Sequence, residues 1–149
     1  MSQEEINKSQ SEINKNIVRE AFEKWDETKA SKVGIDHWRG ILSDKIKFKS
    51  LANGANGAKF TELVLSRDDM ERYFEGLTGT MDMLYYTIDH YIAEDDKVVC
   101  VGKTAWKVKA TGEVYETPKC DVVTFEDGKI VAFYEYYDTA GLIALAPDK

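Results

Sequence analysis

The sequence predicts an α+β fold in which a curved antiparallel sheet is covered by N-terminal helices, giving a cone-like domain with an internal pocket. Three observations indicate this fold. Helical spacing of apolar residues is confined to the part of the chain before Gly79. Long strand-like segments follow it, and only short turn sequences separate them. Strands of this length twist and curl, so amphipathic helices are expected on the concave side of the sheet.

The first predicted helix has the clearest pattern. From Asn16 onward, its apolar side chains fall on one stripe: Ile17, Val18, Ala21, Phe22 and Trp25. Charged residues lie on the opposite side, as in a helix that packs on a sheet. Residues 1–15 are polar and are expected to form a flexible lead-in or a loosely held helical extension. A single domain is therefore placed at residues 16–149.

Further helices and one strand are predicted before Gly79. A second helix is expected over residues 34–42, with Trp38 facing inward, and a strand over residues 44–51. Residues 52–58 are rich in Asn, Gly and Ala and indicate a loop. Ser66 is the expected N-cap of a third helix.

Four strands are predicted in the second half of the chain, at residues 83–93, 97–109, 113–125 and 129–138. Short connections between long strands favour an antiparallel meander. A turn centred on Thr111-Gly112 would place Cys100 opposite Val123, and Cys120 on a different rung. Two reduced thiols are therefore expected rather than a disulfide.

The composition excludes several functions. Lys and Arg total 20 against 27 Asp and Glu, and a net charge of -7 argues against nucleic acid and anionic membranes as partners. No apolar segment approaches the roughly 20 residues of a membrane span, and the polar first 16 residues do not resemble a signal peptide. A cytoplasmic protein is expected. Neither His37 nor His90 lies at metal-ligand spacing, so no metal or cofactor is expected.

Residues 121–142 carry a resemblance to a known family. The Asp-Gly-Lys-Ile turn, followed by an aromatic strand that ends Tyr-Tyr-Asp-Thr, resembles the closing hairpin of the nuclear transport factor 2-like superfamily, and its SnoaL-like branch most. The resemblance covers about residues 16–145. It implies a cofactor-independent isomerase, cyclase or hydratase that acts on a hydrophobic carbonyl or polyketide-like compound. It also implies a homodimer through the sheet face. The alternative on the same fold is a non-catalytic ligand-binding or dimerisation module.

The ketosteroid isomerases of this superfamily use an Asp base, a Tyr and a protonated Asp. Asp121 falls at the position of the protonated Asp. The tyrosine position falls at Ala21 or Phe22, and the base position at Lys49 or Ser50. Of the three roles in this enzyme class, only that of the protonated Asp has a matching residue in this sequence.

The epoxide hydrolases of the superfamily use an Asp-Arg-Asp set, and their final carboxylate aligns with Glu135. The Arg and the first Asp fall near Gly102 and Thr104, so this site is also incomplete. What remains is the pair Asp121 and Glu135. We interpret Asp121 as the principal acid or base, with Glu135 or His90 as its partner, because histidine is the usual proton carrier near pH 7.

The turn between the last two strands decides whether Asp121 and Glu135 share a face. A two-residue turn at 127–128 sends Glu135 to the other face. A three-residue loop at 126–128 places Asp121 opposite Phe133 and brings both carboxylates onto one face. The resemblance favours the second register.

The pocket is expected to be apolar and largely aromatic. Its predicted lining residues are Phe22, Trp25, Trp38, Trp106, Val123, Phe125, Phe133 and Tyr137. A carboxyl in such surroundings has a raised pKa, and a second carboxylate nearby raises one of the two further. One group could then serve as acid and the other as base.

Overall fold

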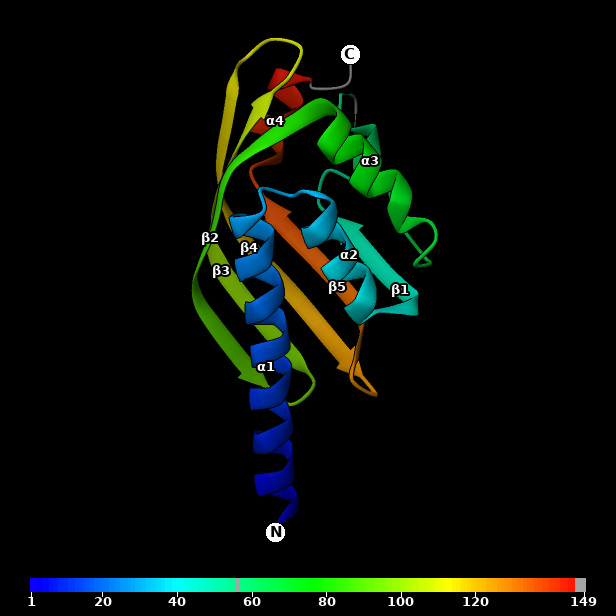
Figure 1. Cartoon of the computed structure of the whole chain (residues 1–149), viewed down its shortest axis with the longest axis vertical. Coiled ribbons are helices and arrows are strands. Elements are labelled where there is room, and N and C mark those ends of the chain that lie inside the picture. The colour runs from blue at the N-terminus through cyan, green and yellow to red at the C-terminus, as the bar shows by residue number, and fades with distance from the viewer. Residues whose placement is uncertain (56, 147–149) are drawn as a thin grey trace.

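The structure is a computed structural model, and it describes residues 1–55 and 57–146. Asn56 of the predicted loop and residues 147–149 of the predicted domain lie outside the described residues. The elements in chain order are α1 (Gln3–Glu27), α2 (Lys32–Ile41), β1 (Leu42–Ser50), the 3-10 helix η1 (Lys59–Thr61), α3 (Met70–Thr80), β2 (Met81–Glu94), β3 (Lys97–Val108), β4 (Val114–Glu126), β5 (Lys129–Tyr137) and α4 (Thr139–Leu145). Figure 1 shows them from blue to red along the chain.

The described strands form one mixed sheet in the order β1-β5-β4-β3-β2. Strands β2 to β5 pair antiparallel, as the predicted meander requires. Strand β1 departs from the expected antiparallel sheet because it pairs parallel with β5, with Phe48 opposite Phe133. Parallel neighbours need a long crossover connection, and here α3 and the other three strands lie between β1 and β5 in the chain.

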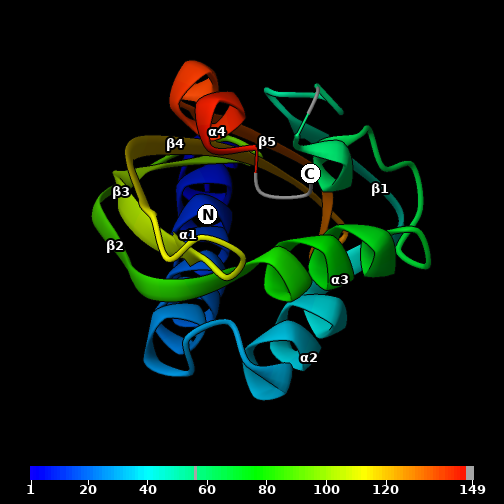
Figure 2. The ribbon, with the colours of Figure 1, turned by 90° about the horizontal axis from the view of Figure 1, so that it is seen from above.

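The sheet is curved, and its concave side holds the core. Figure 2 shows the strands as an arc with α1 inside it, while α2 and α3 lie across the open side of the arc. The C-terminal end of α1 is tied to β2, because the backbone N–H of Tyr86 donates to Asp26 Oδ1 at 2.8 Å. The curved sheet under N-terminal helices that the sequence predicts is therefore confirmed.

Strands β2 and β3 approach closely at Gly102. A Cβ atom at Gly102 would lie 1.9 Å from the carbonyl oxygen of Thr87 on β2. The pairing of β2 with β3 is irregular next to this point, between Ile88 and His90. Glycine inside a strand often marks such a close backbone approach, so the shape of the sheet here depends on the missing side chain.

Helix α1 begins much earlier than the predicted start at Asn16. Ser2 has an extended backbone, and its Oγ accepts a hydrogen bond from the N–H of Glu5 at 3.1 Å, which is the geometry of an N-cap. Residues 3–15 are therefore helical, which is the second of the two predicted alternatives. Ser11 and Asn14 are buried in this extension.

The other helices lie near their predicted positions. Helix α2 begins at Lys32, two residues before the predicted start, and Trp38 is buried as expected. Helix α3 begins at Met70 rather than directly after Ser66, whose Oγ accepts from the N–H of Asp69 in the preceding turn. None of the described helices is both long and apolar enough to cross a membrane.

The β3–β4 hairpin has a longer loop than predicted. Lys107 pairs with Val114, so the two-residue turn at Thr111-Gly112 was the wrong expectation. The register shifts by two residues, and Cys100 lies opposite Asp121 rather than Val123. Cys120 directly precedes Asp121 on β4 and pairs with Val101, so it faces the other side of the sheet from Cys100. Both thiols are free, as predicted.

Candidate functional site

The β4–β5 hairpin brings Asp121 and Glu135 directly opposite each other. Its turn is the two-residue type, because Glu126 pairs with Lys129 and the residues at 127 and 128 both have positive φ. One extra residue in β5 then shifts the register between Thr124 and the turn. The predicted pairing of Asp121 with Phe133 is therefore wrong. Asp121 and Glu135 still share a face, as predicted, because the bulge shifts the register by one residue.

Lys119 lies between the two carboxylates. Its Nζ is 2.5 Å from Asp121 Oδ1 and 3.0 Å from Glu135 Oε2. It also donates to the hydroxyl of Tyr86 at 2.6 Å. The side chain of Lys119 is only 8% exposed, so the three charges form one buried cluster.

Sequence reasoning missed Lys119, although a signal for it exists. Side chains two residues apart in a strand point to the same face. Any register that turns Asp121 inward therefore turns Lys119 inward as well. A lysine on that face needs a carboxylate partner, because an unpaired buried charge is very costly.

Asp121 is sealed behind Lys119 and Tyr86. It is fully buried, and its Oδ2 accepts a hydrogen bond from the Tyr86 hydroxyl at 2.8 Å. Burial raises the pKa of Asp121 above its ordinary value; Lys119 opposes the shift, and Glu135 adds to it. Asp121 is not among the residues that line the cavity described below. Asp121 therefore does not face the cavity, contrary to what its expected role as the principal acid or base requires.

Glu135 accepts hydrogen bonds from side chains of β1 and α3. Ser50 Oγ at the end of β1 donates to Glu135 Oε1 at 2.6 Å. The hydroxyl of Tyr73, on α3, lies 3.0 Å from Oε1 and 3.2 Å from Oε2. Tyr137, on β5, lies 2.5 Å from Ser50 Oγ through its own hydroxyl. Tyr137 is therefore linked to the Glu135 carboxyl through Ser50.

The tyrosines and Lys119 stay protonated at neutral pH. Burial alone lowers the pKa of Lys119, but Asp121 and Glu135 outweigh it and hold the pKa above its ordinary value. Burial, with the nearby carboxylates, raises the pKa of Tyr73 and of Tyr86 well above their ordinary values.

An aromatic cavity opens next to Glu135 and Lys119. It encloses about 750 Å³ of free space, counting its open mouth. Seven of the residues predicted at the site line it: Phe22, Trp25, Trp38, Trp106, Phe133, Glu135 and Tyr137. The ring of Phe22 stacks on that of Tyr86 at 5.2 Å and meets the edge of Trp38 at 5.0 Å.

Val123 and Phe125 were wrongly expected in this lining. Both are buried on the inner face of β4, but they lie on the turn side of Asp121. The lining residues of β4 come from its other half, where Tyr115, Thr117 and Lys119 face the cavity.

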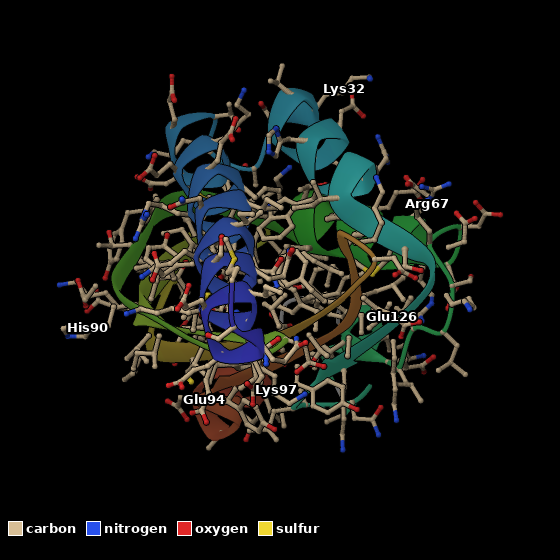
Figure 3. The ribbon with its side chains drawn as sticks, turned by 90° about the horizontal axis from the view of Figure 1, so that it is seen from below. Lys32, Arg67, His90, Glu94, Lys97 and Glu126 are labelled. Carbon is tan, nitrogen blue, oxygen red and sulfur yellow. The ribbon has the colours of Figure 1, made fainter. Side chains whose placement is uncertain are left out.

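His90 is separated from the site. It is exposed on β2, and Figure 3 shows it at the periphery of the molecule with its side chain directed outward. Its neighbour Tyr91 pairs with Cys100 of the inner face, so His90 belongs to the outer face. The expected partnership of His90 with Asp121 is therefore wrong. Among the described residues, no group of His, Cys, Asp and Glu side chains could hold a metal ion.

Solved structures with the same fold define the class of protein. An NTF2-like protein from Burkholderia thailandensis is 22% identical with a TM-score of 0.73, over 91% of this chain and 97% of that chain. A candidate SnoaL-like polyketide cyclase from Mesorhizobium loti is 16% identical with a TM-score of 0.66, over 82% and 97%. A protein with a ketosteroid isomerase-like fold from Catenulispora acidiphila, in complex with trimethylamine, is 12% identical with a TM-score of 0.67, over 85% and 92%. The fold is therefore NTF2-like.

The family follows from the sequence. The model of the SnoaL-like domain matches residues 18–133, which is most of the chain. This chain belongs to the SnoaL-like domain family. No curated protein sequence matches it.

Proposed function

We propose that this protein binds a small, largely apolar molecule in the aromatic cavity and acts on it by cofactor-independent acid–base catalysis. The reaction class is isomerisation, cyclisation or hydration, and the substrate is a hydrophobic carbonyl or polyketide-like compound. The observation that carries the proposal is the position of Glu135, a hydrogen-bonded carboxylate beside Lys119 at the edge of a largely apolar cavity. Ligand sites in proteins combine such apolar walls with a few convergent polar groups.

Glu135 is the proposed base. Lys119, Ser50 and Tyr73 hold its carboxyl in place, and it faces the cavity where a ligand would lie. It would remove a proton from the carbon next to a carbonyl group, and the electron pair would move to the carbonyl oxygen. Once Glu135 is protonated, the Tyr73 hydroxyl no longer needs to donate to it and can donate to that oxygen, the usual means of stabilising such an anion.

Asp121 has a positioning role in this proposal. It does not line the cavity, but it holds the ammonium group of Lys119 beside Glu135. Lys119 supplies a fixed positive charge, and its raised pKa argues against a role as a neutral nucleophile.

The base can be tested with 2-tetralone, a small aromatic ketone with acidic protons next to its carbonyl group. We expect the protein to accelerate exchange of these protons for deuterium in D2O, measured by proton NMR. Glu135→Gln should lower the acceleration by about 100-fold or more, the usual contribution of a general base. His90→Gln, at an exposed position on the outer face, is the matched control and should exchange at the wild-type rate. Equal rates for wild type and Glu135→Gln would remove Glu135 from the mechanism.

A non-catalytic binding module is the second candidate, and one observation favours it. The hydroxyl and ammonium donors around the cavity already donate to protein acceptors: Thr61, Tyr73, Tyr86, Thr104, Tyr115, Thr117 and Lys119. A complete network of this kind also suits a rigid binding site. Quenching of tryptophan fluorescence by 2-tetralone without deuterium exchange would support the binding module over the enzyme.

A further inference from the structure

A proton that reaches Glu135 has few ways to leave it. The neighbouring Lys119 already carries its full set of protons, and its three hydrogens go to Tyr86, Asp121 and Glu135. The hydroxyl of Tyr73 bonds to no other group in the described part of the chain. The walls of the cavity are mainly aromatic and offer few sites for ordered water.

Ser50 differs from these neighbours because its hydrogen bonds lead onward. Its Oγ is within 2.6 Å of Glu135 Oε1 and within 2.5 Å of the Tyr137 hydroxyl. The Tyr137 oxygen also accepts from the backbone N–H of Ala52 at 3.2 Å, in the turn after β1. Ser50 and Glu135 are buried, whereas Tyr137 is half-buried and lines the cavity.

The directions of these hydrogen bonds follow from counting hydrogens. Ser50 has one hydroxyl hydrogen, and it donates this hydrogen to Glu135. The contact between Ser50 and Tyr137 therefore uses the hydrogen of Tyr137, since Ser50 has none left to give. All hydrogens of this series point toward Glu135, which is the arrangement that delivers a proton inward.

We infer that Ser50 and Tyr137 form a proton relay between Glu135 and solvent at the cavity mouth. The inference rests on the proposed function, in which Glu135 is the base. A proton that water gives to Tyr137 Oη releases the Tyr137 hydrogen to Ser50 Oγ. The Ser50 hydrogen then passes to Glu135 Oε1, and both hydroxyl groups end neutral. For the return, the two hydroxyl groups first rotate, so that Ser50 donates to Tyr137 and Tyr137 to water. Protonated Glu135 then gives its proton to Ser50 Oγ, Ser50 gives its hydrogen to Tyr137 Oη, and Tyr137 gives its hydrogen to water.

The test uses 3-cyclohexen-1-one in D2O, because isomerisation to the conjugated ketone removes a proton at one carbon and returns it at another. If Glu135 exchanges its proton through the relay before the return step, the product contains deuterium. We expect Ser50→Ala and Tyr137→Phe to lower the deuterium content of the product at least two-fold relative to wild type. Mass spectrometry measures this content separately from the rate.

Tyr73→Phe is the matched control, since Tyr73 also donates to Glu135 but has no onward partner. It should change the rate and leave the deuterium content of the product unchanged. A merely structural role of Ser50 or Tyr137 would alter the rate alone. Wild-type deuterium content in both Ser50→Ala and Tyr137→Phe would overturn the relay and leave the proposed base intact. Absence of isomerisation by the wild-type protein would overturn the acid–base function, and the relay with it.

Discussion

Asp121 lies opposite Glu135 on the β4–β5 ladder, and the ammonium group of Lys119 bridges the two carboxylates. Like charges directly opposite each other on neighbouring strands are normally destabilising. Here Lys119 precedes Asp121 by two residues, so the same strand that brings in one carboxylate also brings in the cation. The three residues therefore have to be treated as one unit in both stability and function.

Removal of Lys119 should be strongly destabilising. Lys119→Met leaves two buried carboxylates without a cation, and breaking a buried ion pair in this way costs about 3–5 kcal/mol. We expect a loss of this size in the free energy of unfolding, measured by urea denaturation at pH 7. The double variant Lys119→Met, Asp121→Asn should recover part of the loss because one of the two charges is gone. A Lys119→Met protein as stable as wild type would contradict the buried cluster.

The stability of the protein should depend on pH through Asp121. Burial raises the pKa of Asp121 above its ordinary value of 3.8. The folded state therefore holds this proton more tightly than the unfolded state, and its contribution to stability is present below pH 3.8 and lost as the pH rises through the folded pKa. Relative to Asp121→Asn, wild type should lose stability on going from pH 4 to pH 8, measured by urea denaturation at each pH. A relative gain over that interval would show that Lys119 lowers the pKa instead.

Two glycines should respond in opposite ways to alanine. At Gly102 a Cβ atom would meet the backbone of β2, so Gly102→Ala should cost about 1–3 kcal/mol of unfolding free energy. At Gly79, near the end of α3, a Cβ atom meets nothing within 4 Å, and Gly79→Ala should stabilise by up to about 1 kcal/mol. Thermal melting of the two variants compares them directly. Equal melting temperatures would contradict the close approach of β2 and β3.

We propose that the protein forms a homodimer through the outer face of the sheet. Two adjacent rows of this face are largely apolar, and their side chains are half-buried or exposed. One row contains Val99, Val122 and Tyr134, and the next contains Val101, Cys120 and Tyr136. Contiguous apolar patches on a soluble protein often mark an interface. Wild type should elute in size-exclusion chromatography at twice the mass of one chain, and Val122→Arg as a monomer. Val33→Arg, at an exposed position on helix α2 rather than on the sheet, is the control and should remain dimeric; a monomeric wild type would exclude the dimer.

Much of the fold could be predicted from local patterns. The turn sequences around Gly112 and Gly128 and the alternation in the last four strands predict the meander, and the stripe from Val18 to Trp25 predicts the covering helix. The aromatic lining at Phe22, Trp25 and Phe133 follows from the same inward faces.

The rest depends on contacts between distant residues. The parallel pairing of β1 with β5 has no local signal, because the two strands are far apart in the sequence. The occlusion of Asp121 depends on Tyr86, which lies on β2, and on Lys119, which lies two residues before Asp121 on β4. The sequence left open whether residues 1–15 are helical, because the first turns of α1 are polar and mostly exposed, without an apolar stripe.

The extra residue in β5 has a consequence for comparing related chains. Between Thr124 and the turn, the strand contains one residue more than its partner, and this alone decides that Glu135 rather than Tyr134 or Tyr136 faces inward. A relative with a strand of the same length that pairs without this bulge would present an aromatic side chain to the cavity opposite its own residue 121. Family members of the same sequence length could therefore differ in the chemistry of the cavity through the presence or absence of one bulge, with every other strand unchanged.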